Sequence, residues 1–281
     1  MARALPRLIG VIHLPPLPGS PGASHLNPGV ALSKAGLWAV REAVALTKAG
    51  FDGLILENFG DTPFYKSQVP PETIASMAVI AAAVRESTRV ALGINVLRND
   101  ARSALAIAAA TQADFIRVNV LAGVAATDQG LIEGDAAFLL RERARLNASS
   151  IAILADVHVK HAQTLSSVDL SLAIEEVAGR GGADGVILTG TSTGRAPELE
   201  SVKRAIEAAT RAGVPLYLGS GVSSEQLTQG LPREIRIIIG SALRKNGLAG
   251  APLELKRMKK FIQNWKLLQK KGNGKTRRAT S

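Results

Sequence analysis

The sequence predicts an α/β fold, a single (β/α)8 TIM barrel. Eight short runs rich in aliphatic and β-branched residues alternate with Ala-rich segments of helical spacing, an order typical of parallel strands joined by helical crossovers. The segments after the apolar runs are long and polar, whereas those before them are short, which places the elaborated loops at one end of the barrel. The length of 281 residues suits one such domain, which typically needs about 250 residues.

The predicted elements follow one another along the chain without a break. The eight strands are expected at residues 8–14, 53–58, 90–96, 115–120, 151–159, 185–190, 215–221 and 235–242. Helical spacing predicts helices between them at 33–49, 72–86, 100–111, 134–146, 170–180 and 198–212. Long polar loops follow four of the strands, at 14–27, 58–71, 121–134 and 189–198. An eighth helix, packed on the first and last strands, is predicted where apolar residues recur at helical spacing opposite lysines, at Met258, Phe261, Ile262, Trp265 and Leu268.

The net charge of +11 is concentrated at the C-terminus. Residues 256–281 hold seven Lys, three Arg and no Asp or Glu, so the rest of the chain carries only +1. We therefore expect the barrel over residues 1–268 and a basic, disordered tail over residues 269–281. The basic segment is complementary to an anionic membrane surface, which is an alternative role for the last helix. Nucleic acid is not expected as a partner, because the tail lacks interleaved aromatic residues.

The composition excludes several classes of protein. With no Cys, the chain has no disulfide framework, thiol nucleophile or thiolate metal site. No apolar run approaches the roughly 20 residues needed to span a bilayer. We expect a cytoplasmic protein that forms a homo-oligomer, with no surface assigned to its interface.

Two strand-to-helix turns near the C-terminus have the features of a phosphate site. Residues 216–224 read LYLGSGVSS and residues 237–244 read IIIGSALR. Glycine lets the backbone approach an anion, and a helix beginning after each turn would add N–H donors and a partial positive charge. Barrels often bind phosphate after strands seven and eight. The predicted phosphate-binding residues are Gly219, Ser220, Gly221, Gly240 and Ser241.

Polar residues gather at the carboxyl ends of the other predicted strands. Arg117 and Asn119 are two apart, as are Asp156 and His158, so strand alternation puts each pair on one face. Buried charges persist only when they are paired or bound to something. A hydrogen-bonded network, a ligand site or both are therefore expected where these residues meet the ends of the first three strands, at His13, Glu57, Asn58 and Asn95.

Roles can be assigned to these residues by their chemistry. Asp156 and Glu57 are candidate general bases and His158 is a candidate acid or proton shuttle. Lys160 shares their parity and is a candidate anion ligand or Schiff-base nucleophile. Substrate binding is assigned to His13, Asn58, Asn95, Arg117 and Asn119.

Structural alternatives remain open at the same positions. Arg117 with Asp156 is equally consistent with a cross-strand ion pair, and His13 with a bond to neighbouring backbone. No cofactor and no metal are assigned. A divalent metal is the alternative left open by the D-x-H-x-x-H spacing of Asp156, His158 and His161.

Six stretches resemble motifs of the BtpA/SgcQ family: IGVIHLPPLPGSP (9–21), LILENFGDTPF (54–64), LGINVLRND (92–100), FIRVNVLAG (115–123), LADVHVKHA (154–162) and GSGVSSE (219–225). The resemblance spans roughly residues 8–265 and implies a barrel of the ribulose-phosphate-binding type. It carries two functional expectations, a photosystem I assembly or stabilising factor peripheral to the membrane and an enzyme like phosphoribosylanthranilate isomerase. Those isomerases usually place a Cys base after strand one and an Asp acid on strand five. Asp156 matches the second position, whereas His13 occupies the first.

Together these observations predict a protein that binds a phosphorylated small molecule, a sugar phosphate or a nucleotide-like compound. An isomerase, epimerase or lyase using acid–base chemistry is the expected activity. The alternative is a non-catalytic, membrane-associated assembly factor.

Overall fold

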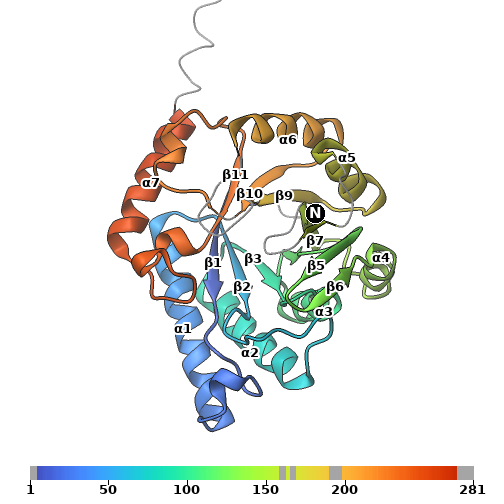
Figure 1. Ribbon diagram of the computed structural model, residues 1–281. Coiled ribbons are helices and arrows are strands. Elements are labelled where there is room, and N and C mark those ends of the chain that lie inside the picture. The colour runs from blue at the N-terminus through green and yellow to red at the C-terminus, as the bar shows by residue number, and fades with distance from the viewer. Residues whose placement is uncertain (1–4, 158–162, 165–168, 190–197, 220, 271–281) are drawn as a thin grey trace, which may run out of the picture.

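The computed structural model describes residues 5–157, 163–164, 169–189, 198–219 and 221–270. Eight parallel strands close into a barrel in the order β1-β11-β10-β9-β7-β4-β3-β2, so the predicted TIM barrel is confirmed (Figure 1). All eight predicted strands are present, as β1 (Leu8–His13), β2 (Gly53–Glu57), β3 (Ala91–Asn95), β4 (Phe115–Val118), β7 (Ala152–Val157), β9 (Gly185–Thr189), β10 (Leu216–Gly219) and β11 (Arg236–Ile239).

Helices surround the barrel (Figure 1). They are α1 (Pro28–Ala49), α2 (Pro71–Ser87), α3 (Ala101–Thr111), α4 (Ala136–Arg145), α5 (Leu170–Glu175), which continues as a π-helical turn over Glu176–Arg180, α6 (Leu199–Arg211) and α7 (Leu255–Lys270). Helix α1 begins five residues before the predicted start, because Asn27 accepts a hydrogen bond from the Gly29 amide and Pro28 occupies the first turn.

Helix α7 closes the ring beside α1, where its apolar side chains, Met258, Phe261, Ile262, Trp265 and Leu268, are buried. The helix continues through Lys270, two residues into the segment predicted as a tail. Residues 271–281 lie outside the described residues. Among the helices that the structure describes, none is both long and apolar enough to cross a membrane.

Alternation along the strands produces two separate apolar cores. One lies between the strands and the helices. The other fills the lower barrel interior, where Phe115 packs among Ile9, Ile55, Leu154, Ile187, Tyr217 and Ile238. Gly93 is required opposite the Phe115 ring, because a Cβ there would lie 2.2 Å from Phe115 Cε2. The lower interior is therefore a packed core.

Tyr217 carries the one hydroxyl of this inner core, and its OH donates to the Pro6 carbonyl at 2.8 Å. Burial raises the pKa of Tyr217 to about 12, an effect that Arg236 only partly offsets.

The raised pKa of Tyr217 predicts a loss of stability at alkaline pH. The folded state holds the phenolic proton more tightly than the unfolded chain, so this contribution is complete below the ordinary pKa of 10.0 and is lost as pH rises towards about 12. Relative to Tyr217→Phe, the wild type should lose about 1.4 kcal/mol between about pH 9 and 11, measured by urea unfolding. A difference that does not change with pH would contradict this expectation.

Two parts of the structure differ from the sequence prediction. The strands β5 (Val124–Thr127) and β6 (Gly130–Glu133) occupy much of the expected loop 121–134, and β8 (Gln163–Thr164), which follows β7, joins them in a three-stranded antiparallel sheet. Its strands are too short to show a clear alternation pattern. The helices predicted directly after the two glycine turns are wrong, because only short 3-10 turns, Gln226–Thr228 and Ser241–Leu243, are present there.

The chain leaves helical geometry soon after each glycine turn. Gly230, with φ of +99°, interrupts the chain soon after the first turn, and extended backbone at Arg244 ends the second. The helix-dipole part of the phosphate argument therefore does not apply to these two turns.

Candidate functional site

A layer of polar side chains lies directly above the inner apolar core. His13, Glu57 and Asn95 end β1, β2 and β3 and are paired in register. Arg117 and Asp156 continue the layer on β4 and β7 and are buried. His13, Glu57, Arg117 and Asp156 each follow an inward-facing apolar residue by two positions, and Asn95 follows Gly93. Strand alternation therefore brings all five into the same end of the barrel interior.

Arg117 is held in this layer by a bidentate ion pair. Its Nε and Nη2 donate to the two oxygens of Asp156 at 3.0 and 2.9 Å, and Asn119 Nδ2 donates to Asp156 Oδ2 at 3.1 Å. Asn95 Nδ2 supports the same group by donating to the Arg117 carbonyl at 3.0 Å and to Asn119 Oδ1 at 3.1 Å. Burial lowers the pKa of Arg117, but the charge and hydrogen bonds of Asp156 and the charge of Glu57 outweigh it, so the pKa is raised. The guanidinium is a permanent cation.

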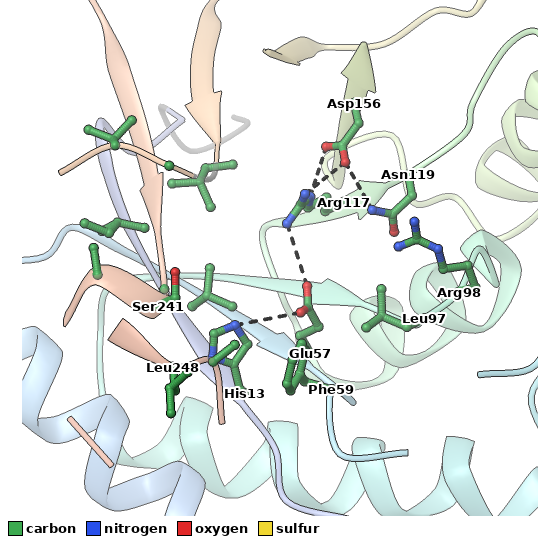
Figure 2. A pocket seen from close by; sticks show the side chains of 18 of the residues that line it. His13, Glu57, Phe59, Leu97, Arg98, Arg117, Asn119, Asp156, Ser241 and Leu248 are labelled. Atoms are coloured by element: carbon green, nitrogen blue, oxygen red, sulfur yellow. Dashed lines mark hydrogen bonds and ion pairs between the residues drawn. The ribbon is translucent and has the colours of Figure 1, made fainter. Parts of the chain in front are cut away.

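Glu57 joins this pair to His13 through longer contacts (Figure 2). Glu57 Oε2 lies 3.7 Å from Arg117 Nη1, and Glu57 Oε1 lies 3.9 Å from His13 Nε2. The Gly250 amide donates to His13 Nδ1 at 3.4 Å, which assigns the imidazole proton of the neutral form to Nε2, on the side of Glu57. The His13 ring also packs on Phe59, with ring centroids 4.7 Å apart.

A cavity of about 360 Å³ opens above this network. It is lined by His13, Glu57, Arg117, Asn119 and Asp156 and also by Gly221, Gly240 and Ser241 from the two glycine turns. These turns are neighbours because β10 pairs with β11. The two turns and the polar layer therefore share one cavity at one end of the barrel, as the sequence predicted.

Each glycine of the two turns is required for a different structural reason. Gly221 has a φ of +85°, which side chains rarely tolerate. A Cβ on Gly240 would lie 2.7 Å from His13 Cε1, so this glycine makes room for the imidazole. Gly219 lies below the cavity, where a Cβ would be 2.7 Å from Ile187 Cγ2.

The remaining predicted site residues separate into two groups. Asn58 and Asn95 are buried beside the cavity without lining it, and Asn58 Oδ1 accepts from the Leu97 amide at 2.7 Å. His158, Lys160 and Ser220 lie outside the described residues. Within the described ranges no cluster of three His, Asp or Glu side chains fits a metal. His158 and His161 lie outside the described residues, so the metal alternative at Asp156, His158 and His161 stays a prediction.

Several cavity residues were not predicted from the sequence. Phe59, Phe64, Leu97 and Arg98 line it from the loops after β2 and β3. All four fall inside the family motifs, LILENFGDTPF and LGINVLRND, but three are apolar, and apolar residues in a single sequence carry no signal of a site.

A second buried ion pair lies next to the cavity, where Arg244 contacts the backbone of the lining residue Val11. The fully buried Arg244 donates to both oxygens of Glu42 at 2.7 Å, to the Val11 carbonyl at 2.8 Å and to the Ala251 carbonyl at 2.6 Å. Burial raises the pKa of Glu42, and Arg244 only partly counters this. The Arg244–Glu42 pair, called the clamp below, thus connects α1, β1 and the loop after β11.

Comparison with known proteins identifies relatives over most of the chain. The BtpA family model matches residues 5–266. The chain is 44% identical to the photosystem I biogenesis protein BtpA of Synechocystis sp., covering 91% of this chain and 86% of that protein. It is also 44% identical to an uncharacterised protein of Methanocaldococcus jannaschii, covering 91% of this chain and 93% of that protein.

Solved structures share the fold at low sequence identity. Phosphoribosyl anthranilate isomerase of Thermus thermophilus superposes with a TM-score of 0.56 at 12% identity, over 93% of this chain and 99% of that one. Thiamine phosphate pyrophosphorylase of Pyrococcus furiosus gives a TM-score of 0.54 at 15% identity, over 93% and 96%. At these identities the likeness establishes the barrel alone.

Proposed function

Because the chain belongs to the BtpA family and has the cavity described above, we propose that it binds a phosphorylated small molecule. We propose further that it isomerises, epimerises or cleaves this molecule by acid–base chemistry. The observation that carries the proposal is the shared cavity, in which two glycine turns face a buried cation, a carboxylate and an imidazole. Two proteins of the same fold are named for phosphorylated compounds, a phosphoribosyl anthranilate isomerase and a thiamine phosphate pyrophosphorylase, which agrees with such a ligand.

The phosphate is assigned to the two turns. Gly221, Gly240 and Ser241 line the cavity, and glycine lets an oxyanion reach backbone N–H groups at van der Waals distance. Arg117 lies at the opposite side of the same cavity (Figure 2). Its bidentate bond to Asp156 fixes the guanidinium, so it is suited to orienting a second polar group of the ligand.

Proton transfer is assigned to Glu57 and His13. Asp156 already accepts three hydrogen bonds, which occupies its oxygens and makes it an orienting group for Arg117. Glu57 is held by contacts of 3.7 and 3.9 Å. It can take a proton from a carbon next to a carbonyl, while His13 Nε2–H donates a proton to the oxygen that gains charge. Glu57 then returns its proton to the neighbouring carbon, which is the former carbonyl carbon. His13 takes back a proton from the other hydroxyl, which becomes the new carbonyl, so the isomerisation is complete and both residues are restored without a cofactor.

The assembly-factor alternative is not favoured by the geometry of the last helix. An amphipathic helix that binds a bilayer inserts its apolar face. In α7 the apolar side chains Met258, Phe261, Ile262, Trp265 and Leu268 are already buried on the barrel.

Ribose 5-phosphate is expected to raise the melting temperature, and Gly221→Asp should abolish that rise. A ligand at about 100 times its Kd stabilises by about 2.7 kcal/mol, or roughly 5–10 °C for a domain of this size. The new carboxylate would repel the phosphate and fill its place. Differential scanning fluorimetry with inorganic phosphate and ribose 5-phosphate measures both effects.

Gly213→Asp is the matched control. Gly213 also has a positive φ, of +72°, but precedes β10 at the other end of the barrel. This variant should carry similar backbone strain and keep the full ligand shift. No shift with either phosphate compound, or a shift that survives Gly221→Asp, would refute the proposed phosphate site.

A further inference from the structure

A second cavity, of about 370 Å³, adjoins the mouth cavity. Phe64 and Leu97 line both spaces, so together they form the partition. The second cavity lies between the loop after β1, the loop after β2 and the start of α2, with Gly19, Asp61, Tyr65 and Thr73 among its lining. It lies on the far side of the partition from the glycine turns, and none of the described residues of those turns lines it.

Asp61 gives this cavity its chemical character. Its Oδ1 accepts from the Leu17 amide at 2.8 Å and its Oδ2 from Asn58 Nδ2 at 3.2 Å. Burial nevertheless raises the pKa of Asp61, because these bonds compensate the loss of solvent only in part. No salt bridge to Asp61 forms among the described residues. A carboxylate in that position favours a ligand that brings N–H donors or positive charge.

The rest of the wall is flat and apolar. Phe64 and Tyr65 contribute aromatic rings, and Pro21, Pro63 and Pro70 contribute pyrrolidine rings. Tyr65 is 60% exposed, so its ring is accessible to a ligand that enters this cavity. Aromatic faces of this kind stack on planar rings.

We propose that this second cavity binds a planar, amino-bearing nitrogenous ring that is joined to the phosphorylated sugar in the mouth cavity. The ligand class is thus a nucleotide-like sugar phosphate, with its phosphate at the Gly221 and Gly240 turns and its ring beside Asp61. Each cavity alone is close to the lower end of the usual range of about 300–1,000 Å³ for ligand sites. The phosphate end of this assignment rests on the proposed function, whereas the ring subsite rests on Asp61 and its aromatic wall.

Isothermal titration with ribose 5-phosphate, adenosine 5′-monophosphate and cytidine 5′-monophosphate tests the assignment. Ring burial should make at least one nucleotide bind about tenfold or more tightly than ribose 5-phosphate. Tyr65→Ala, at an exposed position, and Asp61→Asn, which keeps the side-chain shape, should each remove most of that advantage. Both should leave the Kd of ribose 5-phosphate within about threefold of wild type, and Phe138→Ala, a 40% exposed residue on α4, should change neither affinity.

The outcomes separate the two proposals. If ribose 5-phosphate binds but neither nucleotide binds more tightly, or if the advantage survives both variants, the ring subsite is wrong and the phosphate site stands. If none of the three compounds binds, the proposed function itself fails. If the nucleotides bind and Gly221→Asp leaves them unaffected while Tyr65→Ala weakens them, the ring subsite stands without the phosphate site.

Discussion

Replacement of Arg244 by Met is expected to lower the free energy of unfolding by about 3–5 kcal/mol, the usual cost of removing one partner of a buried ion pair. Arg244 is fully buried, and its loss would leave the Glu42 carboxylate and two backbone carbonyls without their donor. These groups sit where β1, α1 and the chain after β11 meet, so the loss acts on the closure of the barrel. Guanidinium unfolding followed by circular dichroism measures the change.

Two further variants make the Arg244 result interpretable. Arg257→Met removes an exposed arginine bonded to Glu254 at 2.9 Å and should cost no more than about 1 kcal/mol. Adding Glu42→Met to Arg244→Met should recover part of the loss, because the unpaired carboxylate is gone. A loss as small as that of Arg257→Met would show that the clamp does not close the barrel.

Arg117→Met should produce a deficit of similar size, about 3–5 kcal/mol at neutral pH, with a strong dependence on pH. The substitution removes the cation shared by Asp156 and Glu57 and leaves two carboxylates buried together. Protonation relieves this, so the deficit should be largest near neutral pH and should shrink as pH falls towards about 4–5. Urea unfolding across that range, with wild type measured in parallel, gives the difference directly.

The companion variants for Arg117 test whether charge is the cause. Arg143→Met breaks a pair of 2.7 Å with Asp184, whose side chain is 42% exposed, and its smaller deficit should be nearly independent of pH. Arg117→Met combined with Asp156→Asn should be more stable at neutral pH than Arg117→Met alone. An Arg117→Met deficit that does not change with pH would mean that lost packing, and not unpaired charge, is responsible.

The barrel fold could be predicted from the sequence because the patterns that indicate its strands and helices are local and repeat along the chain. Eight apolar runs separated by Ala-rich segments specify the strand order once right-handed crossovers are assumed. The errors occurred where local signals were weak or misleading. The short strands β5, β6 and β8 lack enough residues to show alternation. A helix was expected after each glycine turn, whereas the chain forms only a short 3-10 turn at each place.

The residues of the candidate site could be predicted from the sequence only in part. Strand parity placed Glu57, Arg117 and Asp156 in one layer, because each lies at a strand end with apolar residues two positions earlier. Parity gives no distances, so it could not show that Asp156, and not Glu57, makes the bidentate hydrogen bond to Arg117. Arg244 and Glu42 are separated by about two hundred positions along the chain, and nothing in either neighbourhood marks them as partners.

The inner apolar core around Phe115 and Tyr217 also limits the route by which a ligand can enter and leave the barrel. It seals the barrel beneath the polar layer, so within the described part of the chain no route runs from the cavity to the lower end. A ligand that enters the cavity between the glycine turns and Arg117 must therefore leave through the same opening. Under the proposed function, release of the product must therefore precede binding of the next substrate, and slow release would limit the rate of turnover.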